Sequence, residues 1–144
     1  MSPPVYQDNE SIPDKETLLR RVHLLQLVED SDTGLARVSS GAFKDQYLSV
    51  NFESILTEYG NGPEACLANH QAHKLISFSA GAARQVGQAL CHDPLPEDIS
   101  HGLVFGSKNA NRVLNGLKAA AVWIIPSSAP RYADIEADKG ALGI

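Results

Sequence analysis

The stretch LARVSSGAFKDQYLSVNF, residues 35–52, decides the fold class. It holds two short apolar runs with Gly41 and the polar letters KDQ between them, which predicts two strands or a strand and an extended segment. The link between the runs is too short for a helical crossover, and so is a second link within residues 88–105. We therefore expect a mixed or mainly antiparallel sheet with helices packed on it, an α+β fold, rather than a doubly wound one.

Outward from this stretch, strand and helix patterns alternate irregularly along the chain. Strands are expected near residues 19–23, 74–78, 101–106 and 122–126, the last of them a buried strand. Helices are expected from about Phe52 to Gly60, from the N-cap Ser79 to Leu90, and over residues 109–121.

The length of 144 residues suits one domain, which we place at residues 17–130. Residues 1–16 carry three prolines and several acids, so we expect a flexible polar N-terminal arm. Residues 131–144 are expected to be an irregular or weakly helical tail. With 43% hydrophobic and 20% charged residues, the chain has the composition of a protein that folds by itself.

Charge and segment patterns exclude several classes of function. Twelve basic against seventeen acidic side chains give a net charge of −5, so nucleic acid is an unlikely partner. The acidic start is no secretory signal, and no apolar run approaches the ~20 residues of a membrane span, so we expect no membrane contact and a cytoplasmic location. Cys66 and Cys91 form no CxxC pair and are expected to be buried, reduced thiols.

The first candidate binding group is RRVH, residues 20–23. Alternation along a strand puts Arg21 and His23 on one face and Arg20 and Val22 on the other. A guanidinium grips phosphate through its planar fork, and an imidazole exchanges protons near neutral pH, so this pair suits an anion or a nucleotide. The alternative is an edge strand with solvated basic residues.

Hydroxyl groups supply the second candidate. Ser39 and Ser40 stand beside a glycine, and Ser49 lies in the run that follows. Such hydroxyls can bond phosphate or ribose, although serines in turns commonly satisfy the local backbone instead.

The third candidate is HGLVFGSK, residues 101–108, which begins with His101 and ends with Lys108 ahead of a helix. Free amides, the helix dipole and an ammonium together make an anion site. The GxxxxGK[ST] loop is absent, and the alternative is a glycine turn with a solvated lysine.

Other chemistry has weaker support. HQAH places His70 and His73 three residues apart, where a helix would let them share a metal with His92, but no HExxH or cysteine-rich pattern accompanies them. We therefore assign no metal ligand. No GxSxG elbow supports a Ser-His-Asp hydrolase, and Cys91 and His92 point to opposite faces of a strand.

The ordered motifs LLRRVH, RVSSGAFKDQYLSVNF, LISFSAGAARQVGQALCHDPLPEDISHGLVFGSK and AAAVWIIP resemble an uncharacterised family of short bacterial proteins. The resemblance spans about residues 18–126 and implies no activity.

In motif order the chain also resembles ADP-ribosyltransferase-like folds, including RES-type toxins that consume NAD. That resemblance implies Arg21 or His23 against the NAD pyrophosphate or ribose and Ser49 or Tyr47 beside the nicotinamide. The family's catalytic glutamate has no match in a strand, because Glu97 lies in a turn and Glu136 in the tail.

These patterns leave two functions open. The first is a binding or accessory protein without a cofactor, whose partner is another protein of a toxin, defence or mobile-element system. The second is an NAD- or nucleotide-directed enzyme with an anion-binding cleft. An exposed apolar patch favours the first, and convergence of the polar candidates on one pocket favours the second.

Overall fold

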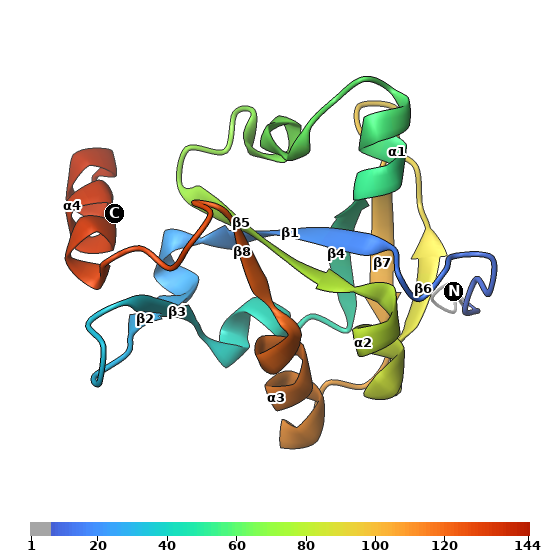
Figure 1. Ribbon diagram of the computed structural model, residues 1–144, viewed down its shortest axis with the longest axis horizontal. Helices are drawn as coiled ribbons and strands as arrows, with labels where there is room; N and C mark the ends of the chain where they lie inside the picture. The colour runs from blue at the N-terminus through green and yellow to red at the C-terminus, as the bar shows by residue number, and fades with distance from the viewer. Residues whose placement is uncertain (1–6) are drawn as a thin grey trace, which may run out of the picture.

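Residues 7–144 are described by a computed structural model, and the chain folds as a single α+β domain (Figure 1). Six strands form one antiparallel sheet in the order β6-β7-β4-β1-β5-β8. They are β1 (Thr17–His23), β4 (Tyr47–Phe52), β5 (His73–Ser79), β6 (Ala89–His92), β7 (His101–Phe105) and β8 (Val122–Ile125). A second sheet pairs β2 (Leu27–Glu29) with β3 (Ala36–Val38). The fold class expected from the sequence is confirmed.

Four α-helices and three short 3-10 helices accompany the strands in the described residues. The α-helices are α1 (Glu53–Glu58), α2 (Ala80–Gln85), α3 (Asn111–Ala120) and α4 (Tyr132–Leu142). The 3-10 helices are η1 (Leu24–Gln26), η2 (Ser40–Phe43) and η3 (Pro63–Leu67). Ser79 caps α2 as expected, since its hydroxyl accepts from the Ala82 N–H at 3.1 Å. Within residues 7–144, the helices are too short or too polar to cross a membrane.

The sheet packs on both of its faces. On one face Leu18 and Val22 of β1 join the large core, which also contains buried side chains of α2, α3 and η2. On the other face Leu19 joins a smaller cluster with Leu56, Cys66 and Leu75, which lies under α1 and η3. Strand alternation therefore places Arg21 on the side of the smaller cluster, together with Leu19.

β1 and β4 pair only briefly before they diverge. β1 pairs with β5 along all of Thr17–His23, but with β4 only at Leu18 and Leu19. Beyond that point the Arg20 guanidinium donates to the Ser49 carbonyl at 3.1 Å and to the Ala42 carbonyl at 3.2 Å. Figure 1 shows β1 lying across β4 and β7, which run upright in that view. The divergence leaves room on the sheet for a hollow beside Arg21.

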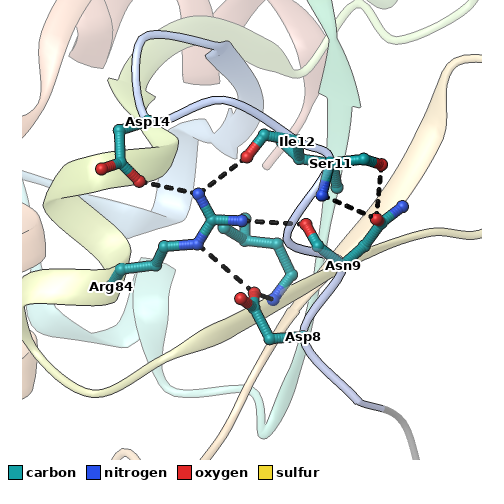
Figure 2. A network of polar contacts seen from close by, with 7 residues as sticks. Asp8, Asn9, Ser11, Ile12, Asp14 and Arg84 are labelled. Carbon is teal, nitrogen blue, oxygen red and sulfur yellow. Dashed lines mark hydrogen bonds and ion pairs between the residues drawn. The ribbon is translucent and has the colours of Figure 1, made fainter.

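The expected N-terminal arm lies against α2 and β6 where it is described, and residues 1–6 lie outside the described residues. Figure 2 shows the Arg84 guanidinium bound to the Ile12 carbonyl at 2.8 Å, the Asn9 carbonyl at 3.0 Å and the Asp14 carboxylate at 2.7 Å. Asp8 completes the network as a second ion-pair partner at 3.4 Å. Arg84 thus helps to hold residues 8–14, together with the Asn9 N–H, which donates to the Leu90 carbonyl of β6 at 2.7 Å. The sequence suggested a flexible segment here.

Three elements differ from the sequence-based expectations. The helix expected to reach Leu90 ends at Gln85, because Gly87 turns the chain with a φ of +81° and residues 89–92 form β6. The expected irregular tail contains α4, which is anchored by the fully buried Ile135. β8, expected to be buried, is an edge strand that pairs with β5, and its Val122 is 58% exposed.

Candidate functional site

A hollow of about 570 Å³ lies on the face of the sheet that carries Arg21. Its floor is formed by β1, β4 and β7, which contribute Arg21, Ser49, Asn51 and His101. Its walls come from α1 and the chain after it, and from the loop ahead of β7. The wall residues are Leu56, Asn61, Ala65, Cys66, Ala68, Asn69, His70, Leu95, Glu97, Asp98, Ile99 and Ser100. The volume is within the range of small-molecule sites.

Arg21 supplies the positive charge of this cavity. Its guanidinium donates one hydrogen bond, to the Cys66 carbonyl at 3.2 Å. The ion pairs found among residues 7–144 all involve other side chains, so within that part of the chain no carboxylate neutralises Arg21. A guanidinium on a cavity floor without a paired carboxylate has donors left for an anion.

His101 connects Ser49 to the loop that precedes β7. Its Nε2 lies 3.1 Å from the Ser49 hydroxyl, and its Nδ1 lies 2.9 Å from the Asp93 carbonyl oxygen. The Asp93 carboxylate approaches the same Nδ1 at 3.3 Å. The register explains the approach, because His101 pairs with Asn51 across β4 and β7, and Ser49 is two positions further along the same face.

Asn51 organises the acidic part of the cavity. Its amide donates to both carboxylate oxygens of Asp98, at 2.8 and 2.9 Å, and lies 2.8 Å from the Ser100 hydroxyl. Ser100 donates in turn to Asp98 at 3.0 Å. The exposed Glu97 lines the cavity beside them. The cavity therefore offers both a cation and hydrogen-bond-accepting carboxylates.

Burial governs the ionisation of Cys66 and His73 in this region. It raises the pKa of the Cys66 thiol to about 11, although nearby Arg21 opposes the rise. Cys66 therefore stays protonated near neutral pH and is a poor nucleophile. Burial, reinforced by His23 and His70, lowers the pKa of His73 to about 4.

Three histidine rings, of His23, His73 and His70, contact one another in that order, and His70 lines the cavity. The ring of His73 packs edge-on against His23 at 5.0 Å and against His70 at 5.3 Å between centroids. HQAH is a turn followed by the start of β5, so His70 and His73 do not lie on a helix, the arrangement in which their spacing would let them share a metal. Among residues 7–144 no group of three or more His, Cys, Asp or Glu side chains is arranged to hold a metal ion.

Three of the seven residues proposed from the sequence meet in the cavity: Arg21, Ser49 and His101. His23 is on the same strand face as Arg21 but caps η1, where its Nδ1 accepts from the Leu25 N–H at 3.0 Å. Ser39 and Ser40 begin η2, away from the cavity lining.

Lys108 does not form the anion site suggested by its position ahead of a helix. It is only 6% exposed, and its ammonium donates to the carbonyls of Gln46, Val104 and Gly106 at 3.0, 3.2 and 3.4 Å. The side chain turns inward because these three carbonyls converge beneath the turn. Lys108 thus joins the chain just before β4 to β7, and it is not among the residues that line the cavity.

Asn51 and Asp98 were not predicted from the sequence as site residues. Asn51 could have been found, since strand alternation puts it on the same face as Ser49. Asp98 reaches the cavity through the irregular loop before β7, whose path no periodic pattern encodes, and Asp93 of the same loop contacts His101. Comparison of the chain with protein-family models, with curated proteins and with solved structures finds no match.

Proposed function

We propose that the protein is a nucleotide-directed enzyme that binds an anionic, nucleotide-type molecule in the Arg21 cavity. The observation that carries this proposal is the meeting of Arg21, Ser49 and His101, from three different strands, in one hollow. This is the convergence expected of an enzyme cleft.

The chemistry of the cavity supports a ligand with both charge and hydroxyl groups. Arg21 is placed to pair with phosphate oxygens through a planar fork. Asp98 and Glu97 offer carboxylate oxygens of the kind that accept hydrogen bonds from ribose hydroxyls. NAD and ADP combine these two features, and NAD is the cofactor that the resemblance to ADP-ribosyltransferase-like folds implies.

A thermal-shift panel of NAD, ADP and ribose 5-phosphate tests this function. A ligand that binds only the folded state adds about 2.7 kcal/mol at 100 times its dissociation constant, which corresponds to several degrees. We expect a shift that disappears in Arg21→Ala and His101→Ala. Arg37→Ala is the matched control, because Arg37 lines a different hollow. No shift with any ligand, in a normally folded protein, contradicts the proposal.

A protein partner is the second candidate, and the outer edge of β8 favours it. Within residues 7–144, β8 pairs only with β5, and the exposed Val122 lies at that edge. Trp123 lines a hollow of about 320 Å³ there, flanked by Arg37 and Lys118. The occupant that fits is an extended partner segment with acidic side chains, which would add to the sheet edge.

A charge-reversal experiment tests this surface. Replacing Arg37 and Lys118 by glutamate should abolish co-purification of such a partner after expression in the native host, whereas Arg21→Ala should retain it. Equal capture by the reversed variant and the wild type would contradict the use of this edge. The partner's membership of a toxin, defence or mobile-element system stays a prediction.

A further inference from the structure

Ser49, His101 and Asp93 form a chain of polar contacts to which the proposed function gives no catalytic role. The Ser49 hydroxyl is 3.1 Å from His101 Nε2, and His101 Nδ1 is 2.9 Å from the Asp93 carbonyl and 3.3 Å from its carboxylate. The three residues come from β4, from β7 and from the chain between β6 and β7, so only the folded sheet brings them together.

The hydrogen bonds fix which imidazole nitrogen carries the proton. A carbonyl oxygen can only accept, so the contact with the Asp93 carbonyl places the proton on Nδ1. The lone pair on Nε2 then faces the Ser49 hydroxyl, which is the arrangement a general base requires. Within the described residues, His101 is the single hydrogen-bond partner of the Ser49 hydroxyl, so Nε2 of His101 is the one acceptor for the Ser49 proton.

We propose that Ser49 is a nucleophile activated by His101, with Asp93 as the positioning residue, and that the cavity hydrolyses carboxylic esters of anionic compounds. The Ser49 oxygen bonds to the ester carbonyl carbon while its proton passes to Nε2. The carbon–alkoxide bond then breaks, and the leaving alcohol takes the proton from His101. A water molecule then gives a proton to the same nitrogen as its oxygen bonds to the acyl carbon. The bond from that carbon to the Ser49 oxygen breaks, Ser49 takes the proton back from Nε2, and the acid leaves.

Other lining residues suit this chemistry. Asn61 and Asn69 line the cavity, and their side-chain amides are the kind of N–H donor that stabilises the negative charge developing on a carbonyl oxygen. Asn69 has a left-handed φ of +63°, a conformation that asparagine tolerates better than most residues. The preference for an anionic substrate rests on the proposed function, in which Arg21 pairs with the negative charge of the ligand.

Active-site labelling tests the nucleophile without a known substrate. A fluorophosphonate probe should add covalently to Ser49, with loss of fluoride, and intact mass with peptide mapping should locate the adduct. Ser49→Ala should abolish the adduct, and His101→Ala should slow its formation by about 100-fold or more. Ser40→Ala, at a half-buried serine outside the cavity, should label like the wild type. No adduct on Ser49 in a folded protein overturns the proposal.

Ester hydrolysis separates this inference from the proposed function. 4-Nitrophenyl hemisuccinate should react faster than neutral 4-nitrophenyl butyrate, and Arg21→Ala should remove the difference while labelling of Ser49 persists. If labelling persists but neither nucleotides nor the anionic ester are preferred, the anion-binding function fails and the nucleophile stands. If nucleotides bind but Ser49 does not label, only the nucleophile is overturned.

The positioning role of Asp93 has its own test. Asp93→Asn should lower kcat for ester hydrolysis and leave KM unchanged, and an unchanged kcat contradicts the positioning role of Asp93.

Discussion

Strand alternation decides the side of the sheet that each arginine of β1 occupies. Arg21 faces the cavity, whereas Arg20 points to the opposite face and donates to the carbonyls of Ser49 and Ala42. The period of two allowed this separation to be predicted from RRVH alone. Lys108 could not be predicted in the same way, because the three carbonyls that bind its ammonium come from β7, from the residue before β4 and from the residue after β7.

The buried ammonium of Lys108 makes stability depend on pH. Burial lowers the pKa of Lys108 to about 8, despite the opposing effect of Asp45. In the unfolded chain the pKa is about 10.4, so between these values the unfolded state binds more protons and stability rises with pH. The cost of burying the charge is fully present below about pH 8 and disappears above about pH 10.4.

Lys108→Met should remove this dependence. Relative to the variant, the wild type should gain roughly 2–3 kcal/mol in free energy of unfolding between pH 7.5 and pH 10.5. Urea unfolding at the two pH values measures the gain, with exposed Lys44→Met as the control for loss of a lysine. A constant difference between wild type and Lys108→Met would contradict the assignment.

At the scale of elements, short apolar runs predicted the buried strands, and apolar periodicity predicted the helices that bury one face. The strands β1, β5 and β7 and the helices α1 and α3 fall where the pattern placed them, with small differences at their ends. The pattern failed at α4, because Ile135 is its one buried side chain and no stripe is visible. It also failed at α2, which is shorter because positive φ at Gly87 starts the turn into β6.

Arg84 joins α2 to residues 8–14, which lie about seventy residues earlier in the sequence. Gly81 adds a second contact, because its backbone N–H donates to the Asp14 carbonyl at 2.8 Å. Arg84→Met should free residues 8–14 locally while the sheet stays folded, because the bonds lost are at the surface of the core.

Limited trypsin digestion measures this release at Lys15. Cleavage after Lys15 should become several times faster in Arg84→Met than in wild type, and urea unfolding should change by only about 1 kcal/mol. Arg112→Met, at an exposed position of α3, is the matched control. Unchanged cleavage at Lys15 would show that Arg84 does not hold the segment.

At the scale of the whole molecule, the cavity exists because β1 and β4 part after two residue pairs. Short links predicted the antiparallel sheet, but nothing in the local patterns encodes where two strands diverge. The walls depend on the chain after α1 and on the loop before β7. Strand residues of the site could therefore be predicted, and loop residues such as Asp98 and Ser100 could not.

A titration of ¹⁵N-labelled protein with ADP, followed by amide chemical shifts, shows directly where the nucleotide binds. We expect the shifted amides to cluster at Arg21, Ser49, His70 and His101, and Arg21→Ala to remove the changes. Shifts that instead cluster around Trp123, or saturating ADP without any shift, would contradict an anion-binding site in the Arg21 cavity.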